Sequence, residues 1–154
     1  MSTTTTAEQN KALMERYFEE VFNKRNAAFG QELISPAYVA HYPTYENPGE
    51  AVTRPGLEFD FDPMAGIPDY RVTVDGQIAE GDTVVSRTTM RGTFTRDLPT
   101  TWGSFPPTGK PVVMTWISIN RFVDGKIVEA WLQWDLLGLF LQFGIVSLPE
   151  KRGK

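Results

Sequence analysis

The sequence predicts an α+β domain in which helices cover one face of an antiparallel sheet. Apolar residues recur at helical spacing near the N-terminus. The chain after Pro68 instead alternates apolar and polar residues and is rich in β-branched side chains, which is typical of strands. Helices followed by a run of strands are typical of α+β domains.

The length and composition indicate one soluble domain. A chain of 154 residues can bury a core of its own. We expect residues 8–148 to form this domain. Residues 1–7 should be a disordered tail, because their threonine tract has nothing to bury, and residues 149–154 should be flexible.

The charge and cysteine content limit the partners and the location. A net charge of -4 offers no basic surface for nucleic acid, and the absence of cysteine excludes disulfides and thiolate chemistry. The apolar segment 136–146 is too short to span a bilayer, and the N-terminus lacks the features of a secretory signal. We therefore expect a cytoplasmic protein that binds neither nucleic acid nor membrane.

The first helix should begin after a threonine cap. Thr5 with Glu8, or Thr6 with Gln9, has the spacing of a capping box. The apolar stripe that follows packs on the core and consists of Leu13, Met14, Tyr17, Phe18, Val21 and Phe22.

The next part of the chain is less regular. Residues 23–26 should end the first helix, and residues 27–35 should form a second, short helix before Pro36. Residues 37–55 are aromatic and turn-rich, and residues 55–66 allow either a third helix or a strand.

Strands then follow one another. We expect turns at Asp75-Gly76 and Gly81-Asp82, a long loop over residues 102–111, and a final hairpin around Asp124-Gly125. The apolar segment after the hairpin should form a short closing helix that begins after Asp135.

The final hairpin can be divided into two faces. If Asp124-Gly125 is a two-residue turn, Val123 lies opposite Lys126, and a bulge would exchange the two sets. The first face is mixed and resembles a pocket lining: Phe122, Asn120, Ser118, Trp116 and Met114 opposite Ile127, Glu129, Trp131, Gln133 and Asp135. The second face is apolar and should pack on a core or another subunit: Arg121, Ile119, Ile117, Thr115 and Val113 opposite Val128, Ala130, Leu132 and Trp134.

The chain resembles the SnoaL-like polyketide cyclases (ester cyclases) of the nuclear-transport-factor-2-like superfamily. The likeness is carried by five stretches in family order: RYFEEVFNKRN, PAYVAHYP, IPDYRVTVDGQIAEGDTVVSRTTMRGTF, FPPTGKPV and INRFVDGKIVEAWLQWDLLGLFLQFG. The resemblance implies a cystatin-like α+β barrel, in which a curved antiparallel sheet wraps over the N-terminal helices and forms a conical pocket. It also implies a homodimer formed through the outer face of the sheet.

The resemblance further implies a chemistry. These cyclases close a ring in a polyketide ester by an aldol condensation, without metal or cofactor, in the biosynthesis of secondary metabolites such as antibiotics. Asp135 matches the catalytic carboxylate of the family, and His41 matches the histidine of its HxP motif. The family's additional histidine has no counterpart here, since His41 is the single histidine. Other lyase or isomerase reactions that move a proton, such as isomerisation or dehydration, therefore stay open.

Several alternatives stand beside these roles. Asp135 can cap the closing helix, act as an acid/base, or do both, and His41 is a structural hydrogen bonder or an acid/base. The residues that we expect to bind a hydrophobic substrate are Tyr17, Phe18, Trp116, Asn120, Glu129, Trp131 and Gln133. Glu129 can instead pair with an arginine. Asp60 and Asp62 lack the third ligand that a cation site would need.

Two other functions compete with a cyclase. An epoxide hydrolase of the same superfamily would need an Asp-Arg-Asp arrangement in the pocket, and the predicted register places Arg121 on the other face from Asp135. A non-catalytic binding or assembly module is the second alternative.

Overall fold

The computed structural model describes residues 5–43, 51–55 and 62–150, with only the backbone given for residues 43 and 51–55. The helices are α1 (Ala7–Tyr17), the π-helical segment η1 (Phe18–Asn23), α2 (Ala27–Leu33) and α3 (Leu136–Phe143). The strands are β1 (Ile34–Pro43), β2 (Ala51–Pro55), β3 (Arg71–Glu80), β4 (Thr83–Thr93), β5 (Leu98–Thr100), β6 (Gly103–Phe105), β7 (Pro111–Val123) and β8 (Lys126–Trp134).

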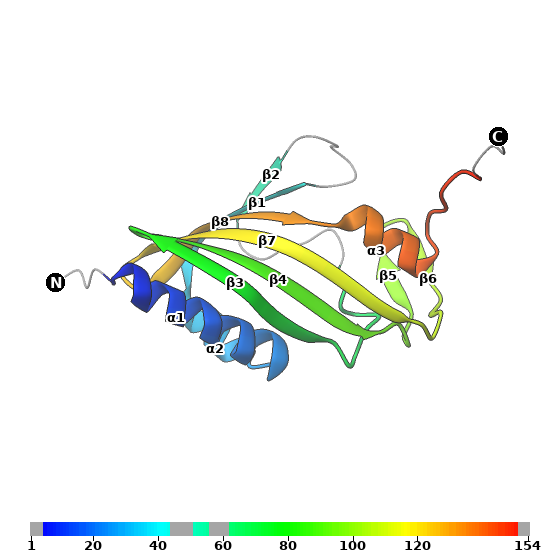
Figure 1. Cartoon of the computed structure of the whole chain (residues 1–154), viewed down its shortest axis with the longest axis horizontal. Helices are drawn as coiled ribbons and strands as arrows, with labels where there is room; N and C mark the ends of the chain where they lie inside the picture. Colours follow the sequence, from blue (N-terminus) through cyan, green and yellow to red (C-terminus); the bar gives the residue numbers. More distant parts are fainter. Residues whose placement is uncertain (1–4, 44–50, 56–61, 151–154) are drawn as a thin grey trace.

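The strands form one large curved sheet and one small hairpin. The large sheet has the order β2-β1-β8-β7-β4-β3, and β5 pairs with β6 apart from it. Neighbouring strands are antiparallel except β1 and β8, which are parallel. Helices α1 and α2 lie against the concave face (Figure 1). The predicted α+β class with a curved sheet over N-terminal helices is confirmed.

Helix α1 begins at the capping box of Thr6 and Gln9, which is one of the two caps that the sequence predicted. Thr6 Oγ1 accepts a hydrogen bond from the backbone N–H of Gln9, and the backbone N–H of Thr6 donates to Gln9 Oε1. At the other end, the Asn23 side chain donates to Val72 O at 2.9 Å and accepts from Val72 N at 2.8 Å. These two bonds fix the end of the helical segment to β3, at the edge of the sheet.

Three predictions about the strands and loops were wrong. Strand β1 takes up residues 34 and 35, which were expected in the second helix, and residues 37–43 of the segment expected to be turn-rich, and residues 103–105 of the predicted loop form β6. Asp75-Gly76 is a bulge within β3 and not a turn, because Arg87 and Thr89 of β4 bond to Asp75 and keep the strands paired. The expected helix or strand over residues 55–66 lies partly outside the described residues, and residues 63–66 form a turn.

The final hairpin turns as predicted, but a bulge follows it. Val123 pairs with Lys126 and Phe122 with Ile127, whereas the next pair is Arg121 with Glu129, so Val128 is the extra residue. The assignment of β7 to its two faces is correct. The assignment of β8 is wrong beyond Val128, because the bulge exchanges the two faces there.

The burial of β8 agrees with the exchange. Ile127 and Ala130, three residues apart, are both buried, and Leu132 and Trp134 follow Ala130 on the concave face. Trp131 and Gln133 lie on the outer face and are exposed.

A second part of the core holds α3 against the far end of the sheet. The rings of Phe94 and Phe143 lie 4.5 Å apart, and Leu139 is fully buried. The Gln142 side chain accepts a hydrogen bond from Val113 N and donates one to Val113 O, which fixes the helix to the backbone of β7.

Gly92 of β4 supplies a first test of this packing. A Cβ at this position would collide with Ile67 Cγ2 and lie 3.0 Å from Tyr70 Cα, so we expect Gly92→Ala to lower the free energy of unfolding by roughly 1–3 kcal/mol. Gly76→Ala is the matched control, since its Cβ would meet only Arg87 Nη2 at 3.9 Å. Urea denaturation measures both variants, and equal stability of the two would contradict the packing around Gly92.

Candidate active site

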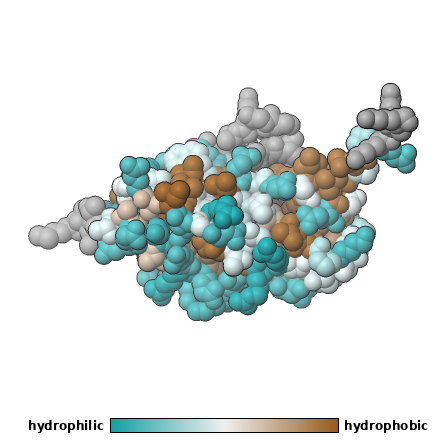
Figure 2. All heavy atoms as spheres, viewed as in Figure 1, coloured by the Kyte–Doolittle hydropathy of each residue, from teal (hydrophilic) through white to brown (hydrophobic). Residues whose placement is uncertain are grey.

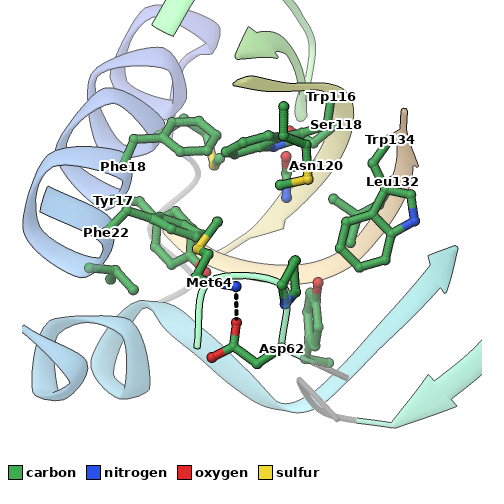
Figure 3. A pocket seen from close by; sticks show the side chains of 15 residues that line it. Tyr17, Phe18, Phe22, Asp62, Met64, Trp116, Ser118, Asn120, Leu132 and Trp134 are labelled. Atoms are coloured by element: carbon green, nitrogen blue, oxygen red, sulfur yellow. Dashed lines mark hydrogen bonds between the residues drawn. The ribbon is translucent and has the colours of Figure 1, made fainter. Parts of the chain in front are cut away.

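A cavity of about 220 Å³ lies between the N-terminal helical segment and the concave face of the sheet (Figure 3). Its lining residues come from α1, η1, β1, the turn at residues 62–64, β7 and β8. They are Met14, Tyr17, Phe18, Val21, Phe22, Tyr38, Asp62, Pro63, Met64, Met114, Trp116, Ser118, Asn120, Leu132 and Trp134. The walls are therefore largely aromatic and apolar, as in sites for small organic ligands.

The π-helical segment contributes one aromatic wall. The rings of Phe18 and Phe22 lie 6.3 and 6.1 Å from the ring of Trp116 on β7. π-helical turns inside α-helices occur frequently at functional sites. The sequence predicted Phe18 and Trp116 as pocket residues. It did not predict the π-helical segment, because the spacing of apolar residues there does not differ visibly from that of an α-helix.

Two tyrosines, Tyr17 and Tyr38, belong to the lining of the cavity. Burial raises the pKa of Tyr17 to about 12. Burial, followed by the proximity of Tyr17, also raises the pKa of Tyr38 above its ordinary range. Both groups are therefore neutral at physiological pH and can donate a hydrogen bond.

Two polar residues of β7 lie deep in the same cavity. Ser118 is 2% exposed and Asn120 is 6% exposed. Ser118 Oγ and Asn120 Oδ1 have no hydrogen-bond partner among the described residues. Asn120 was predicted to bind substrate, and that role stays a prediction; Ser118, which the predicted register had placed on the same face, also lines the cavity.

Asp62 is the carboxylate of the described lining. Its Oδ1 accepts a hydrogen bond from Met64 N at 2.9 Å, and its side chain is exposed at the rim. Figure 3 draws Met64 between Tyr17 and Asp62, and places Asp62 across the pocket from Asn120. In the sequence, Asp62 stood out only as one of two nearby aspartates, Asp60 and Asp62, and two carboxylates are too few ligands for a metal site.

The structure divides the predicted site residues into two groups. Tyr17, Phe18, Trp116 and Asn120 line the cavity. Glu129, Trp131 and Gln133 do not, because the bulge at Val128 turns them to the outer face together with His41.

These outer residues form a cluster that we call the outer polar cluster: His41, Arg121, Glu129 and Trp131. His41 Nε2 lies 2.9 Å from Glu129 Oε1, and Arg121 donates to Glu129 Oε2 from Nε and Nη2 at 3.0 and 2.9 Å. The imidazole stacks on the Trp131 ring at 5.1 Å. The His41 hydrogen bond and then that of Arg121 lower the pKa of Glu129. The predicted pairing of Glu129 with an arginine is confirmed.

Asp135 follows β8 and caps α3. Its Oδ1 accepts a hydrogen bond from Gly138 N at 2.8 Å, and its backbone N–H donates to Thr115 O. The side chain is exposed and is not among the residues that line the cavity. The predicted cap is confirmed, and the catalytic role stays a prediction.

Within residues 5–42 and 62–150, no three His, Asp or Glu side chains gather as a metal site would require. No described helix is long and apolar enough to cross a membrane.

The sequence matches the family model of SnoaL-like polyketide cyclases over residues 12–143. A comparison with curated proteins gave no match.

Solved structures share the fold over nearly the whole chain. The proposed hydroxylase AclR of Streptomyces galilaeus is 22% identical, with 92% of this chain and 100% of AclR covered and a TM-score of 0.70. The proposed polyketide cyclase IdmH of Streptomyces antibioticus is 29% identical, with 88% and 99% covered and a TM-score of 0.68. A proposed polyketide cyclase of Acidithiobacillus ferrooxidans is 23% identical, with 93% and 99% covered and a TM-score of 0.70.

The cap of α3 yields the second test. Asp135→Ala removes the acceptor for Gly138 N–H and should lower the free energy of unfolding by about 1 kcal/mol, whereas Asp135→Asn keeps an acceptor and should lose less. Thermal and urea denaturation of the three proteins check this order. The cap would contribute nothing if Asp135→Ala were as stable as the wild type.

Proposed function

The chain belongs to the SnoaL-like polyketide cyclase family, and from this premise we propose that it closes or rearranges a ring of a polyketide-like molecule held in the pocket. The family and the solved relatives support an enzyme of secondary metabolism. The single observation that carries the proposal is the aromatic cavity with a carboxylate at its rim and neutral donors on its walls.

The proposed reaction is a proton transfer that makes a carbon nucleophile. The Asp62 carboxylate removes a proton from a substrate carbon next to a carbonyl group, and the electron pair moves onto the carbonyl oxygen as an enolate. The enolate carbon then bonds to a second carbonyl carbon of the same molecule. The resulting alkoxide takes the proton back from Asp62, so that no oxidant or reductant is consumed.

The two pocket tyrosines would stabilise the enolate. Tyr17 and Tyr38 are protonated at physiological pH, and each would donate a hydrogen bond to the oxygen on which charge develops. The surrounding rings of Phe18, Phe22 and Trp116 suit the flat rings of a substrate.

The contacts of the two aspartates favour Asp62 over Asp135 as the catalytic base. Asp62 lines the cavity, and its Oδ1 accepts a hydrogen bond from Met64 N at the rim. Asp135 lies outside the lining, and its carboxylate caps α3. Because the family resemblance implies Asp135 instead, the experiment below compares both residues.

The epoxide hydrolase alternative receives no support from the lining. The described residues around the cavity include no arginine, since Arg121 belongs to the outer polar cluster. The other alternative, a non-catalytic binding module, is tested by the deuterium-exchange experiment that follows.

Exchange of the α-hydrogens of 1-tetralone for deuterium tests the proton transfer without knowledge of the natural substrate. We expect the wild type to accelerate the exchange in deuterated water, followed by proton NMR. Asp62→Asn should lower this acceleration by about 10²-fold or more, and Asp135→Asn should leave it unchanged.

The outcomes separate the candidates. Loss of exchange in Asp135→Asn alone would assign the base to Asp135 and refute the role of Asp62. A wild type that binds 1-tetralone but leaves exchange at the rate of the buffer would refute the enzyme and leave a binding module.

A homodimer through the outer face of the sheet is the second part of the proposal. The outer apolar patch consists of Val113, Ile117, Ile119 and Trp131, which are between 37% and 47% exposed. Figure 2 shows apolar side chains among hydrophilic ones over the sheet and over α3. We infer that a second copy covers this patch, because Ile119 and Trp131 are neighbours on paired strands and exposed apolar residues that lie together can form an association site.

Ile119→Asp tests the dimer, because a buried charge without a partner would oppose association. We expect sedimentation velocity to find a dimer for the wild type and a monomer for Ile119→Asp. The control is Leu148→Asp, which charges a residue that is 67% exposed and lies outside the sheet. A monomeric wild type, or an unchanged dimer in Ile119→Asp, would contradict the proposal.

A further inference from the structure

The first residues of β3 lie at an edge of the large sheet, where every second residue points its backbone N–H and C=O groups away from the neighbouring strand. At Val72 both groups are paired, because the Asn23 side chain donates to Val72 O at 2.9 Å and accepts from Val72 N at 2.8 Å. Two residues earlier, Arg25 Nη2 donates to Tyr70 O at 2.9 Å, and Arg25 Cζ lies 3.5 Å from the centre of the Tyr70 ring. We call these contacts of Asn23 and Arg25 the edge clamp.

The edge clamp holds the chain at a place where its conformation is unfavourable. The π-helical segment η1 ends at Asn23, and Lys24 N–H donates to Glu19 O, five residues earlier. Because π-helical turns are rare, these residues would be expected to continue as an α-helix unless other contacts opposed it. Arg25 has a φ of 59°, which is unfavourable for a residue with a Cβ atom. The contacts with β3 therefore accompany two local departures from helical geometry.

The other side of η1 forms a wall of the pocket. Phe18 and Phe22 line the cavity, and their rings lie 6.3 and 6.1 Å from the ring of Trp116 (Figure 3). Phe22 directly precedes Asn23 in the chain, so a movement of Asn23 away from Val72 would also move Phe22 relative to Trp116. Asn23 itself does not belong to the lining, so its effect on a ligand would be indirect.

We propose that Asn23 is a positioning residue of the pocket. Its two bonds to Val72 set the distance between the phenylalanine wall of η1 and Trp116, and thereby how tightly the pocket holds an aromatic ring. This inference rests on the proposed function, because it takes this cavity as the substrate site, but it does not depend on which aspartate is the base.

Gln142 of α3 offers a matched control, since it makes the same pair of bonds with another strand. Its Oε1 accepts from Val113 N at 2.7 Å, and its Nε2 donates to Val113 O at 2.8 Å. Gln142 does not line the cavity. Asn23→Ala and Gln142→Ala each remove a side-chain amide that pairs with a strand backbone, so both should lower the stability. Only Asn23→Ala should change the pocket.

Two measurements on the folded proteins test the proposal: the dissociation constant of 2-naphthol by equilibrium dialysis at pH 7, and the indole N–H signal of Trp116 in ¹⁵N–¹H NMR spectra without ligand. We expect Asn23→Ala to bind the probe about fivefold more weakly, which corresponds to the loss of one aromatic contact. The Trp116 signal should shift, because the rings of Phe18 and Phe22 lie beside it. Gln142→Ala should keep both wild-type values.

A second variant, Asn23→Asp, keeps the test possible if Asn23→Ala does not fold. Its carboxylate can still accept from Val72 N–H but cannot donate to Val72 O. The dissociation constant and the Trp116 signal should therefore change in the same direction as in Asn23→Ala.

The outcomes separate this inference from the proposed function. Wild-type binding and an unshifted Trp116 signal in the Asn23 variants would overturn the inference, even if Asp62→Asn loses the exchange reaction. Equal changes in Gln142→Ala would also overturn it, since they would trace the effect to lost stability rather than to the position of the wall. If the Asn23 variants behave as expected while the wild type does not exchange 1-tetralone, the inference stands and the proposed enzyme is wrong.

Discussion

The β-bulge at Val128 decides which residues meet inside this protein. Without the extra residue, Glu129 would face the apolar cavity, where burial of its charge would be expensive. With it, Glu129 lies on the outer face and bonds to both Arg121 and His41. The same shift turns Ala130, Leu132 and Trp134 toward the concave face. One unpaired residue therefore separates an ionic cluster from an apolar pocket.

The pocket that results has a graded polarity. Its walls are aromatic, its deep end carries the neutral Ser118 and Asn120, and its rim carries the carboxylate of Asp62. Among the described lining residues, the neutral polar groups therefore lie deep in the pocket and the carboxylate lies near water. The buried Tyr17 adds a neutral hydroxyl group to this lining, and burial raises its pKa to about 12. The outer face, by contrast, combines paired charges with the outer apolar patch, as protein interfaces do.

Local chemistry made part of this structure predictable. The capping box at Thr6 and the turn at Asp124-Gly125 each depend on a few neighbouring residues, and both were found from the sequence. The faces of β8 were not, because alternation cannot locate an extra residue when both faces carry tryptophans. The partner that reveals the bulge, His41, lies 88 positions before Glu129. Asp62 gave only the weak signal of an acidic pair, since its place in the lining depends on the tertiary fold around the turn at residues 63–66.

The tryptophans allow the central claim to be measured directly. The chain contains four, of which Trp116 and Trp134 line the pocket, whereas Trp131 lies on the outer face and Trp102 is exposed elsewhere. In a ¹⁵N–¹H NMR titration with 2-naphthol, the indole signals of Trp116 and Trp134 should shift and that of Trp131 should stay in place. A shift of Trp131 with Trp134 unchanged would show that β8 has no bulge at Val128 and would return Gln133 and Glu129 to the pocket.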